Sequence, residues 1–277
     1  QEPETALLAV PQRWFAQLPG QCLSNLHLWA LPSAAFESGS LVKHVLYEDS
    51  LVASTVAGGF AEVYTDFAVH ADGFSRMVVL AGGLAPRRLG RLVQRLLEIE
   101  TYRMMSLLGL PVAKEVGGWL YRCEKQLAEL MDSIGQAKSP DDERGVLATL
   151  SALAAEVEHS VARTTFRFGA AHAYHGLVMQ RIEELRETRI SGLPTFYEFM
   201  QRRLLPAMNT CEAISRRQEE LSARVARNSQ LLRTRVDIEL ERQNQELLAQ
   251  MNSRAKLQLR LQETVEGLSV VVLTYYG

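Results

Sequence analysis

Hydrophobic and polar residues follow a strand-like pattern in the first part of the chain. Short apolar runs beside glycine or proline predict strands at residues 25–31 and 52–56. Residues 60–70 alternate between apolar and polar side chains, which is typical of a half-buried strand. The dipeptide Asp72-Gly73 suits a tight hairpin that connects this strand to a return strand at 74–80. The pattern therefore predicts a meander of at least three strands.

The alternation at 60–70 also predicts which side chains face the core. The expected apolar face comprises Ala61, Val63, Thr65, Phe67 and Val69, and the expected polar face comprises Glu62, Tyr64, Asp66 and His70. Segments 7–18 and 34–44 are consistent with short helices packed on the sheet. We therefore expect a small α/β domain at 1–83. The chain begins with Gln1 and not with Met, so we expect this domain to be incomplete at its N-terminus.

After Gly82-Gly83 the spacing of apolar residues becomes helical. Pro86 suits a first helical turn, and apolar side chains then recur every three or four residues. Gly109 with Pro111 indicates a break, and polar residues at 135–145 indicate a turn. The spacing predicts long antiparallel helices at about 86–108, 109–134, 141–187 and from 195 to the end, with a step at Pro206.

The last helix carries an apolar stripe from Leu221 to Leu268. Its mean step is about 3.6 residues, the period of a straight helix rather than the 3.5 of a heptad coiled coil. We therefore expect packing in a bundle and not a simple two-stranded coiled coil. Asn228 and Gln243 lie within the stripe and are the kind of polar position that fixes register in an assembly. A second stripe widens the apolar surface: Leu231, Ile238, Leu248 and Leu259.

The end of this helix suggests a membrane. Residues 267–277 carry no charged side chain, and Arg254, Lys256 and Arg260 lie shortly before them. This order is typical of a membrane segment whose soluble side faces the cytoplasm. A terminal turn that packs on its own core is the alternative. The expected fold is α+β and mainly α, with a helical domain at 84–267 and the start of an anchor at 268–277.

Composition narrows the class of protein only moderately. The chain has 277 residues, of which 47% are hydrophobic, and a formal net charge of −2. It can therefore bury a core, and it has no global attraction for nucleic acid. Cys22, Cys123 and Cys211 lie far apart, which favours reduced thiols. The sequence has no apolar run of about 18 residues, so we expect residues 1–277 to be soluble.

Three long segments resemble a bacterial family of predicted membrane-anchored proteins, domain of unknown function 3422. They are residues 90–113 (GRLVQRLLEIETYRMMSLLGLPVA), 199–248 (beginning FMQRRLLPAMNTCEAI) and 256–271 (KLQLRLQETVEGLSVV). The resemblance covers roughly residues 40–277. It implies that the GLSVV segment, residues 267–271, opens a hydrophobic region, and that the segment after Leu268 contacts the lipid of the bacterial inner membrane. A looser likeness of layout to CorA magnesium channels implies no shared mechanism, because the Gly-Met-Asn signature is absent: Gln250 precedes Met251-Asn252.

Familiar catalytic motifs are absent from the sequence, which has no phosphate loop, no dinucleotide fingerprint, no H-E-x-x-H and no G-x-S-x-G. We therefore predict no catalytic residue and no cofactor. The metal-ligand candidates are Glu156 with His159 and His172 with His175, each pair three residues apart on one helix. About 20 Å of helix separates the two pairs, so one ion cannot bridge them within a chain. Hydrogen bonding between helices is the favoured interpretation.

Glu98, Glu100, Tyr102 and Arg103 form the most distinctive polar group. Glu100 lies near the apolar stripe of its helix, where a buried carboxylate needs a partner. We expect an ion pair between helices, with Arg202, Arg203 or Arg233 as the partner. A catalytic or ion-sensing carboxylate is the alternative interpretation.

The arginine-rich last helix also contains many acidic residues, which favours a solvated or intersubunit face over a nucleic-acid surface. These patterns predict a non-enzymatic cytoplasmic domain, tethered to the inner membrane, that forms homo-oligomers as a scaffold or regulatory module. One alternative is the regulatory domain of a CorA-like channel or transporter. The other is an unrecognised enzyme with a pocket that gathers Glu98, Glu100 or His172.

Overall fold

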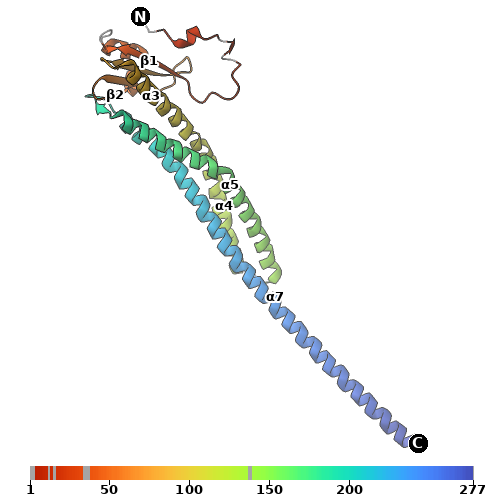
Figure 1. Cartoon of the computed structure of the whole chain (residues 1–277). Coiled ribbons are helices and arrows are strands. Elements are labelled where there is room, and N and C mark those ends of the chain that lie inside the picture. The colour runs from red at the N-terminus through yellow and green to blue at the C-terminus, as the bar shows by residue number, and fades with distance from the viewer. Residues whose placement is uncertain (1–3, 12, 15–16, 34–37, 137–138, 277) are drawn as a thin grey trace. The chain divides into compact units, whose positions relative to one another are not determined.

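A five-stranded sheet and a series of long helices make up most of the chain (Figure 1). The computed structural model describes residues 4–11, 13–14, 17–33, 38–136 and 139–276, and the side chains of all of these except 38–41 and 263–276. The strands are β1 (Leu26–Pro32), β2 (Val52–Val56), β3 (Ala61–Thr65), β4 (Ser75–Ala81) and β5 (Thr188–Arg189). Their order across the sheet is β1-β4-β3-β2-β5.

The predicted meander is confirmed at the centre of this sheet. β2, β3 and β4 pair antiparallel, with Val63 opposite both Ser54 of β2 and Val79 of β4. The sequence predicts β1 as a strand but not its pairing: it lies parallel to β4, with Leu28 opposite Met77. The sequence does not predict β5, which follows the long helix α5 (Pro140–Leu185) and adds to the free side of β2.

The prediction that one strand spans 60–70 is wrong beyond Thr65. β3 ends there, and Phe67 adopts a positive φ of 51°, which breaks the alternation of side chains. Asp66 and His70 are buried although the pattern assigns them to the polar face, and Val69 is 68% exposed although the pattern assigns it to the apolar face. Beyond Thr65, burial therefore follows the loop rather than the strand pattern. Within β3, Tyr64 of the predicted polar face is buried as well, because it packs against Val42 and Val45.

The long helices lie close to their predicted positions. Besides α5 they are α3 (Pro86–Leu107), α4 (Gly109–Gln136), α6 (Phe196–Arg203) and α7 (Leu205–Tyr276). Thr195 caps α6 through a capping box with Glu198, which explains the start of that helix.

The short helices predicted near the N-terminus are found in part. The predicted helix at 34–44 corresponds to α2 (Ser38–Val45), and 34–37 lie outside the described residues. The start of the predicted helix at 7–18 overlaps the 3₁₀ turn η1 (Ala6–Ala9), and residues 12, 15 and 16 lie outside the described residues. A second 3₁₀ turn, η3, spans Glu48–Ser50.

The chain forms two compact units, and the division cuts across the long helices. Unit 1 comprises residues 1–120 and 160–218, and unit 2 comprises 121–159 and 219–277. The sequence predicts a separate sheet domain that ends at residue 83. In the structure the sheet belongs to the same unit as α3, α6 and parts of α4, α5 and α7.

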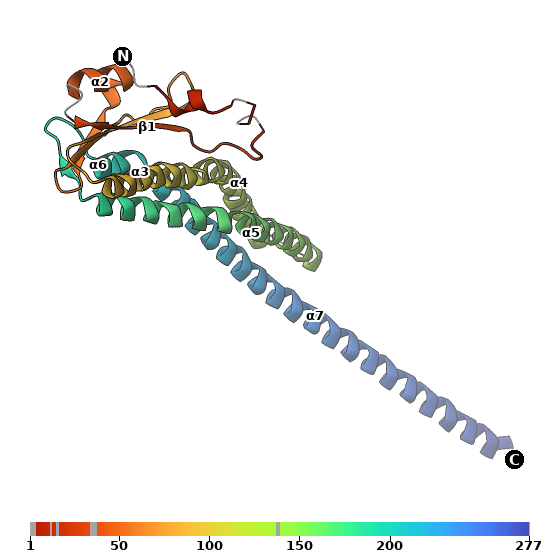
Figure 2. The ribbon, with the colours of Figure 1, turned by 45° about the horizontal axis from the view of Figure 1, so that its top comes forward.

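In unit 1 the sheet has helices on both faces (Figure 2). α2 packs on one face, where Val42, Val45 and Leu46 join Tyr64 and Val78 in one buried cluster. α3 and α6 lie on the opposite face (Figure 2). The core on that side contains fully buried side chains from the sheet and the helices: Met77, Leu96, Ile99, Phe196 and Met200.

Contacts within each unit show that neighbouring helices run antiparallel, as predicted. In unit 1, Glu98 of α3 pairs with Arg181 of α5. Tyr102, one turn later in α3, stacks on Tyr174, which comes about two turns before Arg181 in α5. In unit 2, Ser222 of α7 donates to Glu158 of α5, and Arg235, further along α7, pairs with Glu143, which comes earlier in α5. No helix among the described residues is long and apolar enough to cross a bilayer.

Candidate functional site

Glu100 and Arg103 of α3 form a buried ion pair beside the start of β4. Arg103 donates from Nε to Oε2 of Glu100 at 2.8 Å and from Nη2 to Oε1 at 2.7 Å. The side chain of Glu100 is 4% exposed, and that of Arg103 is 12% exposed. The Ser75 hydroxyl at the start of β4 also donates to Oε1, at 3.3 Å. Glu100 therefore has a two-pronged partner from its own helix.

The predicted partners of Glu100 lie elsewhere, so that prediction is wrong. Arg202 and Arg203 line a separate hollow, and Arg233 is an exposed residue of α7 in the other unit. A local pair forms because residues three apart in a helix point the same way, and Arg103 lies about one turn beyond Glu100. The guanidinium carbon of Arg103 also lies 5.0 Å from the ring centre of Phe67, within cation–π range.

The other members of the predicted polar group face α5 instead. Glu98 accepts hydrogen bonds from Gln94 and Arg181, and these neighbours lower the pKa of its carboxyl group. The rings of Tyr102 and Tyr174 stack with centres 5.7 Å apart. The four residues therefore serve two separate contacts of α3 and do not form one site.

The candidate metal ligands divide between the two units. Glu156 and His159 belong to unit 2, whereas His172 and His175 belong to unit 1. Among the described residues, no three histidine, cysteine or acidic side chains lie close enough together to hold a metal ion. Burial and the neighbouring His172 lower the pKa of His175, and its buried Nε2 has no hydrogen-bond partner among the described atoms.

Asp66 and His70 form a second buried polar contact, in the loop that replaces the end of the predicted strand. His70 Nε2 lies 2.7 Å from Oδ2 of Asp66, and the side chains are 6% and 0% exposed. Asp66 also accepts the backbone N–H groups of Tyr47 and Ala68 at 2.9 and 3.0 Å. Sequence reasoning missed this contact because a strand would keep residues four apart at a distance from one another. Its hydrogen bonds fasten the loop to the chain before β2.

An exposed apolar surface on α7 is the clearest candidate for an interaction site. The apolar residues of the stripe that begins at Leu221 are buried in unit 2 as far as Val236, which is 9% exposed. The same side of the helix then continues into solvent. At 100° per residue, its next large members lie within about 80° of one another around the helix. We call them the apolar face of α7: Leu240, Leu247, Met251 and Leu261, with 38, 57, 66 and 65% exposure.

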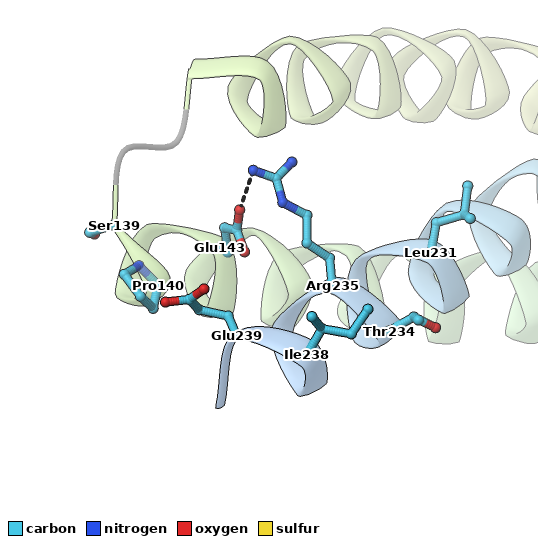
Figure 3. Close-up of a pocket in the computed structure, with 8 residues that line it drawn as sticks. All are labelled: Ser139, Pro140, Glu143, Leu231, Thr234, Arg235, Ile238 and Glu239. Carbon is cyan, nitrogen blue, oxygen red and sulfur yellow. Dashed lines mark ion pairs between the residues drawn. The ribbon is translucent and has the colours of Figure 1, made fainter. Parts of the chain in front are cut away.

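A groove of about 510 Å³ lies at the start of this exposed region, within unit 2 (Figure 3). Its walls are the first residues of α5 and one side of α7, where Leu231 and Ile238 are exposed. Arg235 of α7 points to Glu143 of α5 and donates to it at 2.7 Å (Figure 3). Glu143 lies in the first turn of α5, where the helix dipole favours an acidic side chain. This ion pair holds α7 against α5 just before the apolar face emerges.

Polar side chains also lie on this side of α7. Gln258 and Arg254 are exposed and project within about 25° of the centre of the apolar face. Elsewhere on the helix, acidic and basic side chains pair with one another; for example, Arg242 bonds Glu239 and Glu246. Arg242 is therefore neutralised by its own helix, whereas the apolar face has no cover among the described residues.

Comparison with known proteins identifies the family and nothing more specific. The family model described as a protein of unknown function, DUF3422, matches residues 1–277. No curated protein and no solved structure is detectably similar to the chain.

Proposed function

This chain belongs to the DUF3422 family of proteins of unknown function, and we propose that it is a scaffold or regulatory module that assembles with further copies of itself through the apolar face of α7. The observation that carries the proposal is that the apolar stripe of α7 is buried in its first part and exposed to solvent in its second part. Val225 and Val236 are 0% and 9% exposed, whereas Leu247 and Leu261, within about 40° of them around the helix, are 57% and 65% exposed. A large apolar side chain stabilises a protein by about 1.5–3 kcal/mol when it is fully buried.

A second copy of the same helix is the occupant that we propose. Isolated helices are marginal in water and obtain most of their stability from packing of an apolar face. A second α7 supplies a face of the same length and spacing. In a same-direction pair, Gln258 would meet its own counterpart, and a polar side chain within an apolar seam fixes register between helices. Arg254 can extend its charged end past the edge of the face into water.

The end of the helix supports the same direction for both copies. Both helices continue into the uncharged residues 267–277, and Arg254, Lys256 and Arg260 precede that segment. This order supports a bilayer beyond Leu268 and a cytoplasmic position for the rest of the chain. The resemblance to membrane-anchored proteins supports the bacterial inner membrane. A shared membrane would hold the copies in one orientation and raise their effective concentration, as a short linker does. No enzymatic activity, cofactor or nucleic acid is part of this function.

Substitution of the apolar face tests the assembly. We expect multi-angle light scattering to show an oligomer for residues 1–277 and a weaker one for the double variant L247Q/M251Q, by roughly 100-fold in Kd if the two substitutions together remove about 2.8 kcal/mol. The matched control is I238Q/L259Q, which changes two large apolar side chains that are 65% and 61% exposed on the other side of α7. A chain that is monomeric at all concentrations, or equal weakening by both variants, would contradict the proposal.

A disulfide test checks the direction of pairing. We expect Q258C, in a background with exposed Cys22 replaced by serine, to form a 258–258 disulfide between chains on mild oxidation. A249C, on the opposite side of the helix, is the control and is expected to cross-link poorly. Efficient cross-linking at 249 but not at 258 would refute the same-direction arrangement.

A further inference from the structure

A hollow in unit 1 is lined by four arginines and a single acidic residue. It has a volume of about 460 Å³ and lies where the β2–β3 turn, the start of α3 and the end of α5 meet. The charged residues of its lining are Arg88, Arg91, Arg95, Glu184 and Arg186. The size is that of a site for a small organic molecule.

The arginines reach the hollow from two elements. Arg88, Arg91 and Arg95 lie three and four residues apart, so they share one face of α3. Arg186 follows the last residue of α5 and adopts a positive φ of 48°. Ala57 has a similar φ of 54°, and its N–H donates to the Leu185 carbonyl at 3.4 Å. This contact holds the β2–β3 turn and the end of α5 together at the rim.

Positive charge exceeds negative charge in the lining of the hollow. Arg95 donates to Glu184 at 3.1 Å, and Glu184 also accepts from Arg181 at 2.7 Å, so the one carboxylate is already engaged. Within the part of the chain that the structure describes, no ion pair is found for Arg88, Arg91 or Arg186. Three guanidinium groups around one hollow repel one another unless an anion lies between them.

The floor of the hollow is apolar. Leu92 and Leu185 are 4% and 2% exposed, and they separate the arginines from the core of unit 1. A low-polarity wall strengthens charge-assisted hydrogen bonds made beside it. Guanidinium groups donate in a planar fork that matches the oxygens of phosphate, and several forks favour a group with more than one negative charge.

We propose that this hollow binds a phosphorylated small molecule or headgroup through a group that carries at least two negative charges. Arg88, Arg91 and Arg186 bind the phosphate oxygens, and Glu184 holds Arg95 in place at one side. The site is independent of the apolar face of α7, since all of its residues belong to unit 1.

Calorimetric titration of residues 1–277 with inorganic pyrophosphate tests the site. We expect binding that weakens as salt is raised, and a roughly tenfold or greater loss of affinity for each of R88Q and R91Q, the loss typical of one charge-assisted hydrogen bond. R87Q is the matched control, because Arg87 is exposed on the same helix but does not line the hollow. R91K is expected to retain part of the affinity, since the charge remains and the fork is lost.

Two further binding experiments distinguish a soluble phosphorylated ligand from a lipid headgroup. Titration with a nucleoside diphosphate represents a soluble ligand, and sedimentation with vesicles that contain a phosphatidylinositol phosphate represents a lipid headgroup. Binding in either arm that R91Q reduces and R87Q leaves unchanged supports the proposal. Absence of binding to all three probes, equal losses for R87Q and R91Q, or binding that only an oligonucleotide shows would overturn it. Thermal unfolding without ligand checks that each variant is folded.

Discussion

Replacement of Arg103 by alanine tests how the buried ion pair stabilises unit 1. The substitution removes two hydrogen bonds, of 2.8 and 2.7 Å, from a carboxylate that is 4% exposed. Of the hydrogen bonds described for this carboxylate, only that from the Ser75 hydroxyl, at 3.3 Å, then remains. Loss of one partner from a buried pair typically costs about 3–5 kcal/mol. Because Arg103 is itself 12% exposed, water can enter the space it leaves, so we expect a loss of about 3 kcal/mol.

The cause of this loss can be separated from the loss of packing. Glu100→Gln removes the charge that Arg103→Ala leaves uncompensated. We therefore expect the double variant E100Q/R103A to be more stable than R103A alone, by about 1–2 kcal/mol. The single variant E100Q is expected to cost less than R103A, because the arginine that it leaves unpaired lies closer to solvent.

Urea unfolding followed by tryptophan fluorescence measures these differences. All three tryptophans, Trp14, Trp29 and Trp119, belong to unit 1, so the signal reports that unit. Arg163→Ala is the control, because its pair with Glu115 in the same unit is 59% and 69% exposed and is expected to contribute less than about 1 kcal/mol. The reasoning fails if R103A costs no more than R163A, or if E100Q adds to the loss caused by R103A.

Two further predictions concern packing and pH in unit 1. G109A is expected to destabilise it by about 1–3 kcal/mol in the same urea assay, because a Cβ there would lie 2.9 Å from that of Ala171 and 3.1 Å from Sγ of Cys211. G90A, which meets no atom within 4 Å, should instead stabilise by up to about 1 kcal/mol, and equal effects would refute the packing argument. The folded pKa of His175 lies below the ordinary 6.5, so the unfolded chain takes up its proton first, and stability should fall as pH drops through 6.5 towards the folded pKa. H175Q should show a smaller fall between about pH 7 and 5, and an unchanged profile would contradict this.

The elements predicted well are those fixed by neighbouring residues. Asp72-Gly73 favours a reversal, so the antiparallel pairing of β3 with β4 can be predicted from the sequence, although residues 66–74 between them form a loop. Pro86 and the Thr195–Glu198 capping box likewise mark helix starts. The parallel pairing of β1 with β4 and the addition of β5 depend on contacts between distant residues. No pattern among neighbouring residues specifies which strand will pair with the free edge of a sheet.

The same distinction applies to the candidate sites. The stripe on α7 can be predicted because it repeats along one helix, but its exposure beyond Val236 depends on where α5 begins. The spacing of Arg88, Arg91 and Arg95 is visible in the sequence as well. What completes the hollow is Arg186, brought from the end of α5 by a backbone conformation that no local pattern indicates.

The position of β5 has a consequence for synthesis of the chain. β2 can pair with β3 as soon as residue 65 is available, but its other edge waits for Thr188 and Arg189. At about 5–20 residues per second, roughly ten seconds pass on the ribosome between the two. During that time Val52–Val56 present an unpaired strand edge, the kind of edge to which a strand of another chain can add. We therefore expect this edge of β2 to stay unpaired while α3, α4 and α5 are being made.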